Sequence, residues 1–178
     1  MPGRDSCSID PMSRTDLRTT TVEPAAEPLP ADVAGPPQHT RALDVKVVLV
    51  VREGLPANLA ANAAAVLGAS IGTTRELPLG PDAVDASGTV YDGIVTTPVP
   101  VLIASPDGLE TLFRQASAQD ETTVLALTEV ARQARTYEAY LSDLARTPAA
   151  DSDIVALVVA GRRNHVTKLT KRLPLLGA

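Results

Sequence analysis

The chain has 178 residues, of which 44% are hydrophobic, and it carries a net charge of −5. This length suits one domain with a sizeable core and an added tail, while the negative charge and the scarcity of aromatic residues argue against a nucleic-acid partner. One cysteine and two histidines are too few for a disulfide framework or a cysteine-based metal site, so we expect no metal and no cofactor.

The sequence also bears on the compartment. No apolar run approaches the roughly 20 residues that a bilayer-spanning helix needs, and the chain opens without a charged and apolar leader. We therefore expect no membrane partner and a cytoplasmic protein. Arginine outnumbers lysine and alanine is abundant, which indicates a GC-rich bacterial genome.

Residues 1–43 are predicted to be a disordered tail. Prolines interrupt a polar stretch that shows no apolar periodicity. A single α/β domain is expected over residues 44–178.

The domain is predicted to begin with a buried strand and an alanine-rich helix. The strand is the apolar run from Val45 to Val51, and the helix begins at Pro56 and ends near Gly72. Asn58 and Asn62 fall on one helical face, close to the carboxyl end of the strand, where open α/β sheets bind ligands. Both are therefore candidate substrate-binding residues, although Asn58 equally suits a role at the helix start and Asn62 an exposed position.

A long insertion follows at about residues 73–98. It is rich in glycine and proline, which predicts a functional or mobile loop. Tyr91 within it can close over a ligand and is a further candidate substrate-binding residue. The Tyr-Asp-Gly sequence at this point also suits an ordinary turn.

Three more strands are predicted, at Val99–Ala104, Thr122–Leu127 and Ile154–Val159. Ser105 can cap a helix after the first of them, and Pro106 can open that helix. The spacing of the first two strands fits a right-handed crossover between parallel strands.

Two helices are predicted in the rest of the chain. Apolar residues recur at steps of three and four from Val130 to about Arg146, which indicates an amphipathic helix. Asn164 is predicted to cap a last helix that Pro174 ends.

Four segments resemble a known family: VLVVREGL at Val48, AANAAAV at Ala60, ASPDGLETL at Ala104 and VTKLTKRLPLL at Val166. Across residues 44–178 the chain resembles the type-II peptidyl-tRNA hydrolase fold, and more closely an uncharacterised bacterial family that shares it, domain-of-unknown-function family two thousand. The resemblance implies an α/β fold with a small mixed four-stranded β-sheet and helices on both faces.

The chain departs from the hydrolases at their motifs. The hydrolases carry a lysine near the start of the first helix and read AAQ-x-x-H there, whereas this chain reads AANAAA from Ala60. After the third strand they read roughly D-A-G-R-T-Q, and Glu129 to Ala134 occupy that place here. An acid and an arginine, Arg132, are kept, but the lysine, histidine and threonine are absent. The resemblance therefore implies an inherited pocket with altered chemistry, in which Arg132 contacts substrate.

Glu129 is the candidate catalytic residue. A carboxylate at the end of an apolar strand can lose solvent and act as a general base. In the first turn of a helix, however, the helix dipole would keep its pKa low.

Basic residues gather near the end of the chain: Arg162, Arg163, His165, Lys168, Lys171 and Arg172. Arg162 and Arg163 precede a predicted helix start, which is a natural anion site, and with Lys168 they are candidate substrate-binding residues. A charge run of this kind also commonly solvates a surface helix.

Two classes of function are consistent with these features. The first is an enzyme for a small, amino-acid-derived, anionic substrate, in which Glu129 takes a proton while the arginines hold the anion. Acyl or amide hydrolysis, or ring closure by intramolecular displacement in specialised metabolism, would use that pairing. The second is a non-catalytic ligand-binding or accessory protein that has lost the hydrolase residues. A peptidyl-tRNA hydrolase is a third hypothesis, and a homodimer stays open as the assembly.

Overall fold

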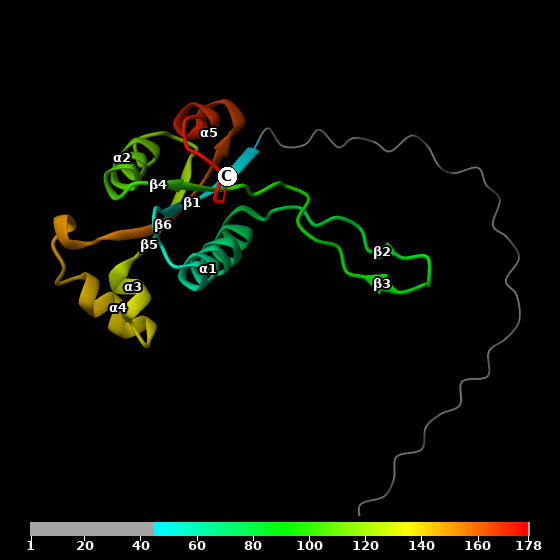
Figure 1. Ribbon diagram of the computed structural model, residues 1–178, viewed down its shortest axis with the longest axis horizontal. Helices are drawn as coiled ribbons and strands as arrows, with labels where there is room; N and C mark the ends of the chain where they lie inside the picture. Colours follow the sequence, from blue (N-terminus) through cyan, green and yellow to red (C-terminus); the bar gives the residue numbers. More distant parts are fainter. Residues whose placement is uncertain (1–44, 178) are drawn as a thin grey trace, which may run out of the picture. The chain divides into compact units, whose positions relative to one another are not determined.

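A four-stranded mixed sheet forms the centre of the molecule (Figure 1). The computed structural model describes residues 45–177, and the predicted tail lies outside the described residues. The strand order is β4-β1-β6-β5. The strands are β1 (Val45–Arg52), β4 (Val101–Ala104), β5 (Thr123–Thr128) and β6 (Ile154–Arg162). β1 runs parallel to β4, whereas β6 runs antiparallel to both β1 and β5. The predicted α/β fold with a mixed four-stranded sheet is confirmed.

Helices cover both faces of this sheet. α1 (Ala57–Arg75) packs on one face, against alternate residues of β1 such as Val47 and Leu49. α2 (Pro106–Ser117) and α5 (Arg163–Thr170) pack on the other face, against the other alternate set of β1 residues, such as Val48. The central strands β1 and β6 are therefore almost entirely buried, as a continuous apolar run predicts for a doubly covered strand.

The start of α2 agrees with the sequence prediction. Ser105 is extended, and its hydroxyl oxygen accepts a hydrogen bond of 3.2 Å from the Gly108 amide. Pro106 follows at the first helical position, where its missing N–H costs nothing.

Two predictions about the elements are wrong. The single helix expected from Val130 to Arg146 is two helices, α3 (Glu129–Gln133) and α4 (Tyr137–Leu144), and the short helix η1 (Ala149–Asp151) follows. The break occurs because Thr136 is extended and its hydroxyl accepts from the Ala139 amide at 3.2 Å, which starts a new helix.

The predicted crossover does join parallel strands, since β4 and β5 point the same way, and it spans the whole sheet because β1 and β6 lie between them. The other error concerns the last cap. Asn164 does not cap α5, because the helix begins at Arg163 directly after β6. Its side-chain oxygen instead accepts from the His165 amide at 2.8 Å.

The insertion contains a long β-hairpin, which we call the arm and define as residues 78–96. Its paired strands are β2 (Ala83–Val84) and β3 (Val90–Tyr91), and a further bridge joins Leu79 to Val95. Figure 1 shows the arm extending away from the four-stranded sheet.

Candidate functional site: charged strand ends beside an apolar groove

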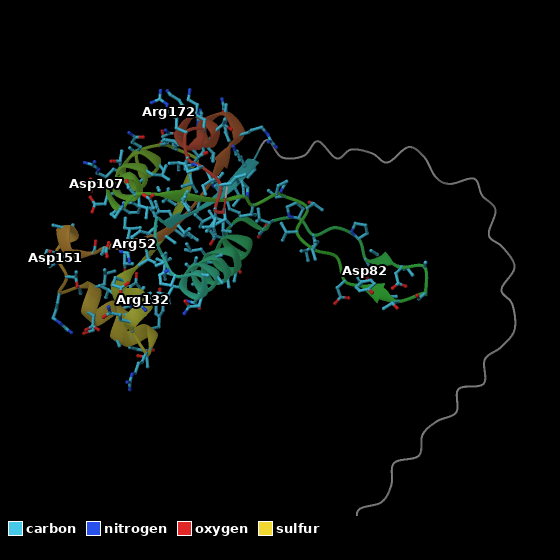
Figure 2. All side chains as sticks on the ribbon, viewed as in Figure 1. Arg52, Asp82, Asp107, Arg132, Asp151 and Arg172 are labelled. Atoms are coloured by element: carbon cyan, nitrogen blue, oxygen red, sulfur yellow. The ribbon has the colours of Figure 1, made fainter. Side chains whose placement is uncertain are left out.

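Three strand ends place charged residues at one end of the sheet. β1 ends at Arg52, Glu129 follows β5, and Asp153 precedes β6, which runs the opposite way. The Glu129 amide donates a 2.8 Å hydrogen bond to the Asp153 carbonyl, which fixes the start of α3 against the start of β6. Figure 2 shows Arg52 and Arg132 in this part of the molecule.

The charges at this edge form two ion pairs. Arg52 donates to Asp153, and Arg132 donates through two nitrogens to both carboxylate oxygens of Glu129, one of them at 2.8 Å. Gln133 adds a further hydrogen bond of 2.7 Å to Glu129. We call these five residues the strand-end cluster. The pairs are only partly shielded from water, since 27% of the side chains of both Glu129 and Arg132 stays exposed.

Glu129 is held as a carboxylate by its neighbours. Hydrogen bonds from Arg132 and then Gln133, with smaller contributions from the charges of Arg132 and Arg52, lower the pKa of Glu129 to about 2, against the opposing effect of burial. The pKa of Arg132 is raised by the same contact. A carboxylate of such low basicity takes a proton poorly at neutral pH. The catalytic role of Glu129 stays a prediction, and it requires that a ligand first displace Arg132.

An apolar groove lies along the outer edge of β5, between α1 and the α3–α4 segment, and has a volume of about 660 Å³. Leu67, Leu125 and Leu127 belong to its apolar lining, and Ala131 of α3 contributes to it as well. We call it the α1–α4 groove. α3 thus carries a groove residue as well as Glu129 and Arg132 of the strand-end cluster.

Aromatic and polar side chains of the α1–α4 groove come from the helix break. Tyr137 and Tyr140 meet edge to face, with ring centroids 5.5 Å apart. Arg135 and Thr136 lie just before them in the chain. Our sequence predictions missed these residues because they assigned the segment to one continuous helix. The available signal was that two of the three tyrosines fall three residues apart.

The predicted asparagines lie elsewhere. α1 buries Ala60 and Ala63 against the sheet, and at 3.6 residues per turn Asn58 and Asn62 fall on the opposite, exposed face. Their predicted contact with substrate stays a prediction. Tyr91 lies on the arm, where its hydroxyl donates to Asp85 at 3.1 Å, so it is remote from the strand-end cluster.

The predicted anion-binding residues lie at the other end of the sheet. Arg162 ends β6 and pairs with Glu121 at 2.6 Å, while Arg163 and Lys168 belong to α5. Glu129 is next to the first residue of β6, and a strand of nine residues is about 26 Å long. The structure does not bring Glu129 and these arginines together, so one small molecule cannot contact both.

Similarity to known proteins identifies the family. The family described as "Protein of unknown function (DUF2000)" matches residues 45–177, which is most of the chain. The chain belongs to the DUF2000 family. No curated protein matches this DUF2000 chain significantly.

A solved structure shares the DUF2000 chain's fold. It is a protein of unknown function, Atu0240 from Agrobacterium tumefaciens strain C58, with a TM-score of 0.66 and 21% identity. The match covers 75% of this chain and 98% of the other, so nearly the whole of that protein has a counterpart here.

Two further findings concern the part of the DUF2000 chain between residues 45 and 177. None of its helices combines the length and apolar content that crossing a bilayer requires. It also holds no group of three or more histidine, cysteine, aspartate or glutamate side chains placed to bind a metal ion.

Proposed function

We propose that this DUF2000 protein binds a small, amino-acid-derived molecule in the α1–α4 groove, with an apolar portion against Leu125 and Leu127 and an anionic group at Arg135. The observation that supports this most is the groove itself. Its volume of about 660 Å³ falls in the range of small-molecule sites, and its lining joins apolar side chains to a few polar groups.

Arg135 supports an anionic ligand. It is exposed, and it takes part in none of the salt bridges among residues 45–177. A guanidinium binds a carboxylate through two parallel hydrogen bonds, so a carboxylate ligand would gain a strong contact there. The rings of Tyr137 and Tyr140 offer apolar surface next to it. An N-acyl amino acid joins an apolar chain to a carboxylate and matches this arrangement.

Binding is tested with a panel of N-acyl amino acids and their methyl esters, which keep the apolar chain but lose the charge. We expect the free acids to raise the thermal midpoint and the esters to raise it less, since an acid at a hundredfold excess over its Kd stabilises the fold by about 2.7 kcal/mol. Arg135→Gln should remove the difference between acid and ester.

Arg146→Gln is the matched control. Arg146 follows α4 and pairs with Asp143, outside the groove. Acid-specific stabilisation that survives Arg135→Gln, or that disappears equally in both variants, would refute the assignment of Arg135.

An enzyme is the second candidate, and the strand-end cluster favours it. A substrate carboxylate that takes Arg132 away from Glu129 would remove the main cause of the low pKa, and Glu129 would then be able to accept a proton. Proton removal from an attacking water or amine serves acyl or amide hydrolysis, or ring closure of the kind found in bacterial specialised metabolism.

Glu129→Gln tests this candidate separately from binding, because glutamine keeps the size of the side chain and loses its basicity. The panel acids should still bind to the variant, whereas any turnover of them, followed as released product, should fall at least a hundredfold. Undiminished turnover would exclude Glu129 as the base and leave the binding proposal standing.

A further inference from the structure

The arm exposes more apolar surface than its own fold can cover. Leu79, Val84, Val90, Tyr91 and Ile94 are between 55% and 80% exposed. A two-stranded hairpin is marginal on its own in water, and a contiguous exposed apolar surface marks a contact site. The arm therefore has the character of an element that is completed by a partner.

The arm is nevertheless built as a defined ribbon. At its tip Asp85 accepts hydrogen bonds from the amides of Ser87 at 2.8 Å and Thr89 at 3.0 Å. Near its base Gly80 and Gly93 approach so closely that a Cβ on Gly93 would overlap the Gly80 carbonyl. The arm therefore presents its side chains in a fixed arrangement.

The charges of the arm are of one sign. Residues 76–100 contain no lysine or arginine. Ala83 pairs with Tyr91, so Asp82 and Asp92 occupy the neighbouring register position, opposite each other. Like charges that face each other across a hairpin destabilise it. A cation from outside the arm would relieve this repulsion, and Figure 2 shows Asp82 on the extended part of the arm.

A basic surface that is complementary in charge to the acidic arm lies on α5. Arg163, Asn164, Thr167, Lys168 and Lys171 line a shallow groove of about 520 Å³, which we call the α5 face. Residues 154–178 contain no acid, and Lys46 adds its charge by donating to Thr167 at 3.1 Å. The arm extends away from α5 of its own chain (Figure 1), so its own α5 face is not what it covers.

We infer that this DUF2000 protein forms a two-fold dimer in which the arm of each copy lies on the α5 face of the other. Asp82 and Asp92 meet Lys168 and Lys171, and the apolar arm residues cover the groove between the basic side chains.

Each copy carries both halves of this contact at the same end of its sheet. Arg75, at the base of the arm, donates to the carbonyls of Glu121 and Ala160, and β6 then runs directly into α5. Both contacts can therefore form at once across one two-fold axis, which gives a closed dimer rather than a filament.

The mass of the full chain in solution, measured by sedimentation over a wide concentration range, tests the inference. The wild type should be dimeric. Asp82→Lys with Asp92→Lys, and separately Lys168→Asp with Lys171→Asp, should each raise the dimer Kd at least tenfold, because each variant sets like charges against each other. Circular dichroism and the thermal midpoint show whether the variants are folded.

Mixing the two variants gives the sharpest outcome. The lysine arm of one variant then faces the aspartates on α5 of the other, and the native arm faces the native α5 face. A one-to-one mixture should therefore form a heterodimer, although each variant alone dimerises at least tenfold more weakly than the wild type. Glu110→Lys, on the exposed side of α2, is the control and should stay dimeric.

Three outcomes would overturn the inference. They are a wild type that is monomeric at every concentration, a dimer that resists both charge reversals, and variants that fail to associate when mixed. Inorganic phosphate that stabilises the wild type and the arm variant equally would assign the α5 face to a small anion instead. None of these outcomes bears on ligand binding in the α1–α4 groove.

Discussion

At the scale of single residues, Glu129 shows how neighbours decide what a carboxylate can do. Its place at the end of an apolar strand suggests a base with raised pKa, yet Arg132 and Gln133 lie one helical turn away and donate to it. The result is a pKa of about 2. The contact with Glu129 therefore orients the Arg132 guanidinium.

This pKa predicts a specific dependence of stability on pH. The folded value of about 2 lies below the ordinary 4.5, so the Glu129 contacts stabilise the fold fully above pH 4.5, and this contribution is lost as the pH falls toward 2. Glu129→Gln lacks the titrating group. We expect wild type to be more stable than this variant at neutral pH and the gap to close across that window, as measured by urea midpoints.

Glu138→Gln, which removes an exposed carboxylate of α4 outside the strand-end cluster, is the control for that experiment. A gap between wild type and Glu129→Gln that stays constant from pH 7 to pH 2 would contradict the assigned pKa.

The strand-end cluster was only partly predictable from sequence. Glu129 was predicted because it follows an apolar run, and Arg132 because the hydrolase motif keeps an arginine there. The partnership of Arg52 with Asp153 was not predictable, since it requires β1 and β6 to lie side by side. For the same reason the sequence did not reveal that Arg162 lies at the opposite end of β6 from Glu129.

At the scale of elements, the break between α3 and α4 creates much of the α1–α4 groove. The apolar periodicity of the segment continues through the break, which is why a single helix was expected. Thr136 interrupts the helix despite this periodicity, because it caps α4, and the turn leaves Tyr137 70% exposed. By contrast, all four predicted sheet strands are confirmed, because runs buried on two faces leave a continuous apolar signal.

Removal of the cap tests this explanation. Thr136→Ala should lower the free energy of unfolding by about 1 kcal/mol, because the Ala139 amide loses its acceptor. Urea denaturation measures the change, with Ser117→Ala at the exposed end of α2 as the control. Equal effects of the two substitutions would show that the cap does not hold the break.

At the scale of the whole molecule, the net charge of −5 conceals a strong separation of charge. The arm carries only acids, and the last 25 residues carry only bases. Composition alone therefore gives the net charge correctly but not the distribution of charge over the surface. A binding partner contacts a local surface, so the distribution decides its binding. The folding of residues 78–96 into a hairpin was likewise not predictable, because the breakers that indicate a loop also permit a hairpin.

The pairing of β1 with β6 has a consequence for how the protein is made. These two strands form the centre of the sheet, yet they lie near the two ends of the described chain. On the ribosome, β1 and the apolar face of α1 emerge before β6, and residues 53–153 must be made before β1 can pair with β6. One side of β1 must therefore stay unpaired until the whole segment before β6 has been made, which exposes apolar surface in early folding intermediates and favours their aggregation.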